Sequence, residues 1–216
     1  YQELKEIASY NYFFTPITEI KDGGIQEVYD LSVPEGNTYS ANGMISHNTL
    51  ETIATYTALL AKYPDYKLMI ICPSSAMYQW ANEFVKFTNG VTTQIVEAGD
   101  IKLNDDKGKK TLKSFDSREY LFNQFINSNK NVVIFNYNTM HTDFLSYISG
   151  MMQKYKFMVV FDEATAFKNP KSHTFKHAQE VSKLGDRVYA LTATIIKNNH
   201  IEAWSIYQVV LPGLLG

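Results

Sequence analysis

Cysteine is nearly absent from this chain of 216 residues, whose only thiol is Cys72. A single cysteine excludes an internal disulfide and a structural zinc site built from several thiolates. No uninterrupted apolar run approaches the roughly 20 residues that a membrane-spanning helix needs. The residues after Tyr1 also lack the basic-then-apolar pattern of a secretory leader. We therefore expect a cytoplasmic protein with no membrane partner.

Charge is scarce as well, at 19% of residues, and it is unevenly distributed. Residues 1–48 hold two basic and seven acidic side chains, whereas residues 49–216 hold 18 basic and 15 acidic ones. This change of sign favours two modules that meet near residue 48. With 45% apolar residues, the chain has material for one full core and a small additional module. Because the first residue is not methionine, we expect a piece of a longer product.

The hydropathy pattern changes at the same place. Residues 13–45 form short alternating runs broken by Gly, Pro and Asn-Gly turns, which predicts a small all-β element. After Thr49 the pattern becomes amphipathic helix followed by buried strand, which indicates an α/β fold with a parallel sheet. Helices are predicted over 50–62 and 77–87, and strands over 67–72, 132–135, 157–161 and 188–191. The polar stretch 104–113 is predicted to be a solvated loop.

Two motifs close the all-β segment, namely Val-Tyr-Asp-Leu at 28–31 and Asn-Gly-Met-Ile-Ser-His-Asn-Thr at 42–49. Together they resemble the C-terminal end of an intein, the self-splicing element of the Hedgehog/intein (Hint) fold, over about residues 13–48. The His-Asn pair precedes a hydroxyl residue, and the Tyr-Asp-Leu motif lies about 18 residues upstream. The alternative interpretation is a hairpin in which the His-Asn pair is incidental.

The residue types at this junction suit a cleavage reaction. The side-chain amide of Asn48 can attack its own backbone carbonyl, which closes a succinimide and breaks the bond to Thr49. His47 is placed to protonate or hydrogen-bond that scissile carbonyl, and Thr49 supplies a hydroxyl that would accept the upstream segment as an ester. The resemblance implies that Asp30 tunes the transfer steps. Many inteins carry a histidine where this chain has Asn37.

A second set of motifs begins at the same junction. The run from Thr49 to Ala54 looks like the tail of a phosphate-binding loop cut between its lysine and its hydroxyl residue. Residues 159–165 resemble a Walker B strand that ends in two carboxylates, Asp162 and Glu163. By this resemblance Thr49 and Asp162 bind Mg²⁺, and Glu163 orients or deprotonates the attacking water.

Further motifs extend the likeness over essentially all of residues 49–216. In order, they are Cys72-Pro73 with Trp80, Glu83 and Phe87, residues 132–137, residues 162–172, residues 191–199, Glu202 with Trp204, and residues 211–213. This series resembles the first ATPase lobe of a Swi/Snf-type superfamily 2 helicase.

The helicase resemblance implies a RecA-like P-loop sheet flanked by helices, the cofactors ATP and Mg²⁺, and double-stranded DNA as partner. Thr192, Ala193 and Thr194 would couple the nucleotide state to DNA contact, and the loops after Cys72 and Phe135 would face the DNA backbone. Thr165 and Ile195 depart from the family, which often has histidine and proline at these positions.

Other prominent residues have plainer interpretations. Trp80 and Trp204 occupy apolar helical stripes, which favours core positions over base-stacking platforms. Cys72 is expected to be a buried small hydrophobe rather than a nucleophile. Lys168, Lys171 and Lys176 could contact phosphates or form a solvated basic face, and the sequence leaves both open.

Both sets of motifs share Thr49, which is the residue after the intein and the hydroxyl of the phosphate loop. The sequence therefore predicts a C-terminal intein fragment over 1–48 and a partial helicase lobe over 49–216. The expected partners are an N-terminal intein half and an upstream host-protein segment, in a bacterial or phage-infected cell. The unspliced chain is expected to be inactive as an ATPase. Two alternatives remain, a self-processing module with an inactive passenger lobe and a nucleic-acid-binding fragment without turnover.

Overall fold

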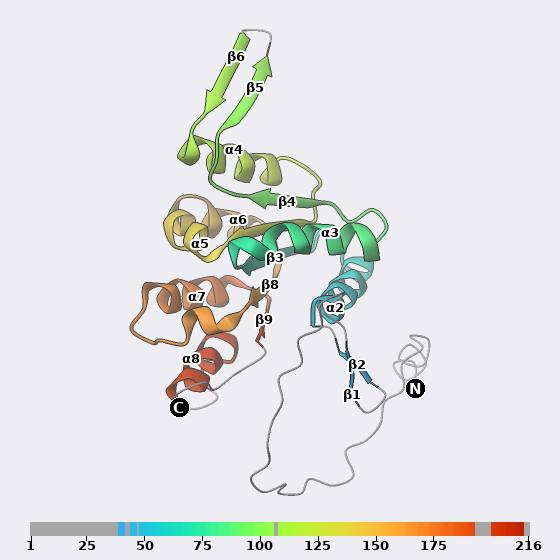
Figure 1. Ribbon diagram of the computed structural model, residues 1–216, viewed down its shortest axis with the longest axis vertical. Helices are drawn as coiled ribbons and strands as arrows, with labels where there is room; N and C mark the ends of the chain where they lie inside the picture. The colour runs from blue at the N-terminus through green and yellow to red at the C-terminus, as the bar shows by residue number, and fades with distance from the viewer. Residues whose placement is uncertain (1–38, 42–43, 47, 106–107, 193–199, 214–216) are drawn as a thin grey trace, which may run out of the picture. The chain divides into compact units, whose positions relative to one another are not determined.

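A parallel five-stranded sheet forms the centre of the computed structural model, which describes residues 39–41, 44–46, 48–105, 108–192 and 200–213 (Figure 1). The strand order is β4-β7-β3-β8-β9. The strands are β3 (Lys67–Cys72), β4 (Thr93–Val96), β7 (Val132–Asn136), β8 (Phe157–Asp162) and β9 (Arg187–Leu191). Four of these five strands were predicted from the sequence and are confirmed. The four-residue strand β4 was not predicted.

The central strand β3 is apolar along its whole length because helices cover both faces of the sheet. All six of its residues are buried. Side chains alternate between the two faces, so Leu68, Ile70 and Cys72 belong to one apolar cluster and Met69 and Ile71 to the other. Among the described strands, β9 has a neighbour on one side only, and its residues are half-buried or exposed.

Two helices cover the first face of the sheet, α2 (Asn48–Lys62) and α3 (Met77–Phe87). Ile53 and Tyr56 from α2 pack there with Trp80 and Phe84 from α3. The second face is covered by α4 (Ser114–Ile126), α5 (Tyr137–Asp143), α6 (Ser149–Lys154), α7 (His173–Leu184) and α8 (His200–Val210). A five-residue π-helix, Phe144–Ile148, joins α5 to α6. The two predicted helices are confirmed.

The prediction of a loop over residues 104–113 was wrong. An antiparallel hairpin of β5 (Ile101–Asp105) and β6 (Gly108–Leu112) occupies this region, with Ile101 opposite Leu112. The hairpin projects beyond α4 (Figure 1). Backbone hydrogen bonds define such a ribbon, and no large apolar face has to be buried, so the hydropathy pattern carried no strand signal.

A separate two-stranded sheet is formed by β1 (Tyr39–Ala41) and β2 (Met44–Ser46). β1 and all of β2 except Ser46 fall within the segment 13–45 that the sequence predicts to be all-β, and the rest of that segment lies outside the described residues. In the part of the chain that the structure describes, no helix has the length and apolar character that a membrane crossing requires.

Candidate functional site

The carboxyl ends of four parallel strands lie at one edge of the sheet, where Asp162 and Thr192 are found. Cys72 at the end of β3 pairs in register with Asn136 at the end of β7. Asp162 at the end of β8 pairs with Leu191, which Thr192 follows directly. In open α/β sheets ligands bind outside this edge, and we name it the carboxyl edge.

Asp162 is held in place by three hydrogen bonds from three different elements. The indole Nε1–H of Trp80 donates to its Oδ2 at 2.8 Å, and the backbone N–H of Glu163 donates to its Oδ1 at 3.0 Å. The Tyr137 hydroxyl donates to its backbone carbonyl at 2.7 Å. Asp162 itself is half-buried.

The prediction that Trp80 is a core residue is confirmed, and Trp80 also has a role that the sequence did not reveal. It is 2% exposed, within the cluster beneath α2 and α3, as a core residue should be. Its polar atom nevertheless reaches the carboxyl edge and fixes Asp162. The two residues are 82 positions apart in the sequence, and no local motif links them.

Glu163 adopts a strained backbone conformation directly after β8. Its φ of 54° and ψ of 56° place it in the left-handed region, and it is the one non-glycine residue with positive φ in the described ranges. Such conformations cost about 1–3 kcal/mol and cluster at functional sites. The bend lets Ala164 enter the core while the Glu163 side chain stays exposed. The chain therefore presents two adjacent carboxylates in different environments.

Cys72 and Tyr137, whose electrostatic neighbours include Asp162, both have raised pKa values. Burial, with a smaller contribution from the Asp162 charge, raises the pKa of Cys72 to about 12. Burial is also the main cause of the raised pKa of Tyr137, and the neighbouring Asp162 charge adds to it. Cys72 is fully buried and free, which agrees with its prediction as a small hydrophobe. Tyr137 stays a hydrogen-bond donor to the strand end.

Two loops at the carboxyl edge are joined by Asn136. Its Oδ1 accepts from the Thr139 N–H at 2.8 Å, which caps α5, and its Nδ2 donates to Ser74 Oγ at 3.0 Å. The loops after Cys72 and Phe135 are therefore held side by side. The helicase resemblance predicts that these loops face DNA.

Among the predicted lysines, Lys168 is engaged within the protein. Its Nζ lies 3.3 Å from Glu202 Oε1, which ties the loop after β8 to α8. Lys171 and Lys176 are exposed. The prediction of Trp204 as a core residue was wrong, since its ring is 37% exposed and stacks on Phe175 with centroids 6.2 Å apart. Trp204 belongs to the predicted apolar stripe of α8, but its side chain is only partly buried.

Thr49 lies in the first turn of α2 and is half-buried. Only four residues separate the end of α2 from the start of β3. The N-terminus of a helix is a natural anion site, because its first N–H groups lack partners within the helix.

The predicted splicing residues lie mostly beyond the described ranges. Asp30 and His47 fall outside the described residues, as do Ala193 and Thr194 of the predicted coupling motif. Asn48 is the first residue of α2. Thr192 is half-buried and directly follows β9.

This architecture, a parallel sheet between two layers of helices with a strand that ends in two carboxylates, is that of the RecA-like α/β proteins. Residues 40–216 match the model of the SNF2-related domain, and the chain belongs to that family. Its sheet and helices form a lobe of the kind found in Snf2-family ATP-dependent helicases.

Individual relatives agree with this assignment. An uncharacterized ATP-dependent helicase of Mycoplasma genitalium is 29% identical over 170 residues, which are 77% of this chain and 14% of that protein. The DNA repair and recombination protein RAD54 of Saccharomyces cerevisiae is 30% identical over 173 residues, or 78% of this chain and 18% of that protein. The chain thus spans less than a fifth of either relative.

A solved structure shows the same arrangement. The Sulfolobus solfataricus SWI2/SNF2 ATPase core in complex with double-stranded DNA superposes with a TM-score of 0.55 at 25% identity. The match covers 78% of this chain and 30% of that chain. The predicted Swi/Snf-type lobe is confirmed at the level of family and fold.

Proposed function

We propose that the chain is the intein-interrupted precursor of a DNA-dependent ATPase. Residues 1–48 act in protein splicing, and residues 49–216 form the ATP-binding lobe of the mature protein. The observation that carries this proposal is the position of the junction, because α2 begins at Asn48. The Asn48–Thr49 bond therefore lies in the first turn of α2. A helix that leads into a parallel strand through a short connection usually runs antiparallel to that strand, so we infer that α2 begins at the carboxyl edge, where Asp162 lies. Phosphate-binding loops occupy this place in P-loop proteins.

The splicing half of the proposal rests on side-chain chemistry. The Asn48 amide nitrogen attacks its own backbone carbonyl, and His47 donates a proton or hydrogen bond at that carbonyl as the bond to Thr49 breaks. The Thr49 hydroxyl holds the upstream segment as an ester before this step. Asp30 tunes the transfer. A complementary N-terminal intein half supplies the remaining strands, because about 48 residues bury too little for a stable β core.

The ATPase half places nucleotide and metal at the carboxyl edge. Asp162 suits a hard cation held through water. Each of its carboxylate oxygens accepts one hydrogen bond and has a further lone pair with which to accept another. Thr49 would supply the second oxygen ligand. Bound Mg²⁺ would neutralise charge on the phosphate oxygens. Glu163, exposed beside Asp162, orients or deprotonates the attacking water.

Splicing would complete the phosphate site. An upstream segment that ends in Gly-Lys would be joined to Thr49, so that its backbone N–H groups and its lysine meet the head of α2. In the unspliced chain the residues before Thr49 are Ser46, His47 and Asn48. We therefore propose that this form binds ATP–Mg²⁺ poorly and does not hydrolyse it.

Double-stranded DNA is the proposed partner of the spliced protein. The DNA complex of the Sulfolobus solfataricus core supports this choice. The segment Thr192, Ala193 and Thr194 would couple the nucleotide state to DNA contact, because it follows β9 at the edge that holds Asp162.

Intact mass spectrometry tests the splicing step. The chain alone should show slow or no scission of Asn48–Thr49. Addition of an N-terminal half from a split Hint-fold intein, fused to a segment ending in Gly-Lys, should yield ligated product. Asn48→Ala should abolish release of the downstream lobe, and Asn42→Ala, in the same segment, serves as the matched control. Efficient cleavage by the Asn48→Ala variant contradicts the assignment.

A DNA-stimulated phosphate-release assay tests the ATPase step in the spliced protein. Glu163→Gln should abolish turnover and retain ATP binding, because the amide keeps the shape and removes the base. Glu180→Gln, an exposed carboxylate on α7 paired with Lys183, is the control and should leave turnover unchanged. Splicing without any ATP turnover would favour the alternative of an intein with an inactive passenger lobe.

A further inference from the structure

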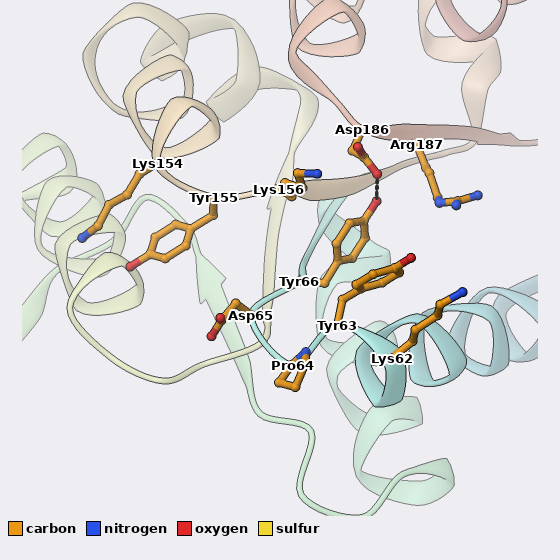
Figure 2. Close-up of a pocket in the computed structure, with 10 residues that line it drawn as sticks. All are labelled: Lys62, Tyr63, Pro64, Asp65, Tyr66, Lys154, Tyr155, Lys156, Asp186 and Arg187. Atoms are coloured by element: carbon orange, nitrogen blue, oxygen red, sulfur yellow. Dashed lines mark hydrogen bonds between the residues drawn. The ribbon is translucent and has the colours of Figure 1, made fainter.

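A second pocket lies at the opposite edge of the sheet from Asp162. It has a volume of about 660 Å³ and is lined by three chain connections (Figure 2). Residues 62–66 comprise the end of α2 and its connection to β3, residues 154–156 the end of α6 and its connection to β8, and residues 186–187 the last residue before β9 and the first residue of that strand. Because these connections precede parallel strands of five or six residues, the pocket is about 20 Å from the carboxyl edge. It is too distant to share a ligand with the proposed ATP site.

Positive charge predominates in this pocket. Four of its ten lining residues are basic, namely Lys62, Lys154, Lys156 and Arg187, against the two carboxylates of Asp65 and Asp186. Asp186 already accepts a hydrogen bond of 2.6 Å from the Tyr66 hydroxyl. Among the described residues the three lysines pair with no carboxylate. An anionic ligand would therefore meet cations that are not already neutralised.

Aromatic rings lie beside these cations. Tyr63 is 47% exposed, and the Lys62 Nζ lies over its ring, 5.6 Å from the ring centroid. Its neighbour Tyr66 is buried, with the two ring centroids 6.2 Å apart, which supports the exposed ring from within the protein. Lys62 and Arg187 extend on the same side as the Tyr63 ring, whereas Lys154 points away from it (Figure 2).

We propose that this pocket binds single-stranded nucleic acid. An unpaired base stacks on the exposed face of Tyr63, and the adjacent phosphates contact Lys62, Lys156 and Arg187. A ring that accepts a base, next to cations that accept the backbone, is the combination used by proteins that bind single strands. A duplex can satisfy the cations but not the ring, because its bases are stacked on one another. The pocket does not depend on the proposed ATP site and has no residue in common with it.

Fluorescence anisotropy of a labelled twelve-nucleotide oligothymidine with the full 216-residue chain tests this proposal. Tyr63→Ala should weaken binding about tenfold, or about 1.4 kcal/mol, as expected for the loss of one stacked base, and Tyr63→Phe should retain it. Arg187→Ala should reduce the slope of log K against log salt by about 0.7 for one lost phosphate contact. Tyr78→Ala and Lys86→Ala, both exposed on α3, are the matched controls and should match the unmodified chain.

Crosslinking and competition measurements distinguish a single strand from other occupants. Ultraviolet crosslinking of a bromouridine-substituted strand should identify Tyr63 by mass spectrometry. Equal binding of a blunt duplex, with no effect of Tyr63→Ala, would overturn the proposal in favour of simple phosphate attraction. Displacement by polyglutamate at the same charge concentration would overturn it in favour of an acidic peptide. Absence of binding to the oligothymidine would refute it outright, whatever the result of the ATPase assay.

Discussion

Removal of the indole nitrogen of Trp80 should destabilise the lobe by more than the loss of ring volume explains. The Trp80→Phe variant keeps an aromatic ring in the core but loses the hydrogen bond of 2.8 Å to Asp162. Hydrogen bonds to charged groups contribute about 1.5–3 kcal/mol. The missing ring atoms leave a small cavity at a site that is 2% exposed, which costs about 1 kcal/mol more. The expected decrease in unfolding free energy is therefore about 2.5–4 kcal/mol.

Urea denaturation followed by far-ultraviolet circular dichroism measures this difference. The matched control is Trp204→Phe, because the chain has only two tryptophans and Trp204 is partly exposed and stacked on Phe175. The control should lose less than about 1 kcal/mol, as expected for a surface substitution. Each variant retains one tryptophan, whose fluorescence then reports unfolding of a single known site.

A double-mutant cycle isolates the hydrogen bond. In an Asp162→Ala background the acceptor is gone, so Trp80→Phe should cost only the packing contribution of about 1 kcal/mol. The coupling free energy between the two positions should therefore be about 1.5–3 kcal/mol. Equal losses for the two tryptophan variants, or an unchanged cost of Trp80→Phe without Asp162, would refute the idea that Trp80 positions the carboxylate.

The stability of the lobe should depend on three other buried groups. Burial raises the pKa of Cys72 from its ordinary value of 9.0 to about 12, so the unfolded chain loses this proton first and stability falls as pH rises above about 9. Relative to Cys72→Ala, urea titrations should show a loss of about 1.4 kcal/mol between pH 8 and pH 10. Arg118 pairs with the fully buried Asp143 at 2.5 Å, and Arg118→Ala should cost about 3–5 kcal/mol in the same assay, against less than about 1 kcal/mol for the exposed Lys183→Ala. Tyr56→Phe should cost about 1–2 kcal/mol, because its buried hydroxyl shares its one proton between the backbone carbonyls of Tyr66 and Asn131. A loss below about 0.5 kcal/mol would contradict this.

The strands of the sheet could be predicted because burial on both faces leaves a strong signal. A run such as 67–72 has no polar side chain after its first residue, and few structures other than a buried strand suit so short an apolar run. The hairpin at 101–112 carried no such signal, because its stability comes from backbone pairing. Hydropathy alone therefore found the centre of the sheet and missed its projecting ribbon.

The two acidic residues of the candidate site could be predicted from the sequence, but the groups that surround and position them could not. Asp162 and Glu163 stand together in a motif, and the sequence pointed to them directly. The Trp80 hydrogen bond joins residues 82 positions apart, and the left-handed backbone at Glu163 depends on the packing of Ala164. Neither leaves a local pattern. The pocket around Tyr63 likewise forms from three connections that only the fold brings together.

The open edge of strand β9 affects how readily the chain associates with other chains. On its outer side, among the described strands, the backbone donors and acceptors of residues 187–191 have no partner strand. The Val-Tyr-Ala-Leu sequence there is apolar, and its side chains are only half-buried. An edge of this kind is a template for pairing with other chains and a starting point for aggregation. A strand that occupies this edge would complete the sheet and also protect the newly made protein from self-association.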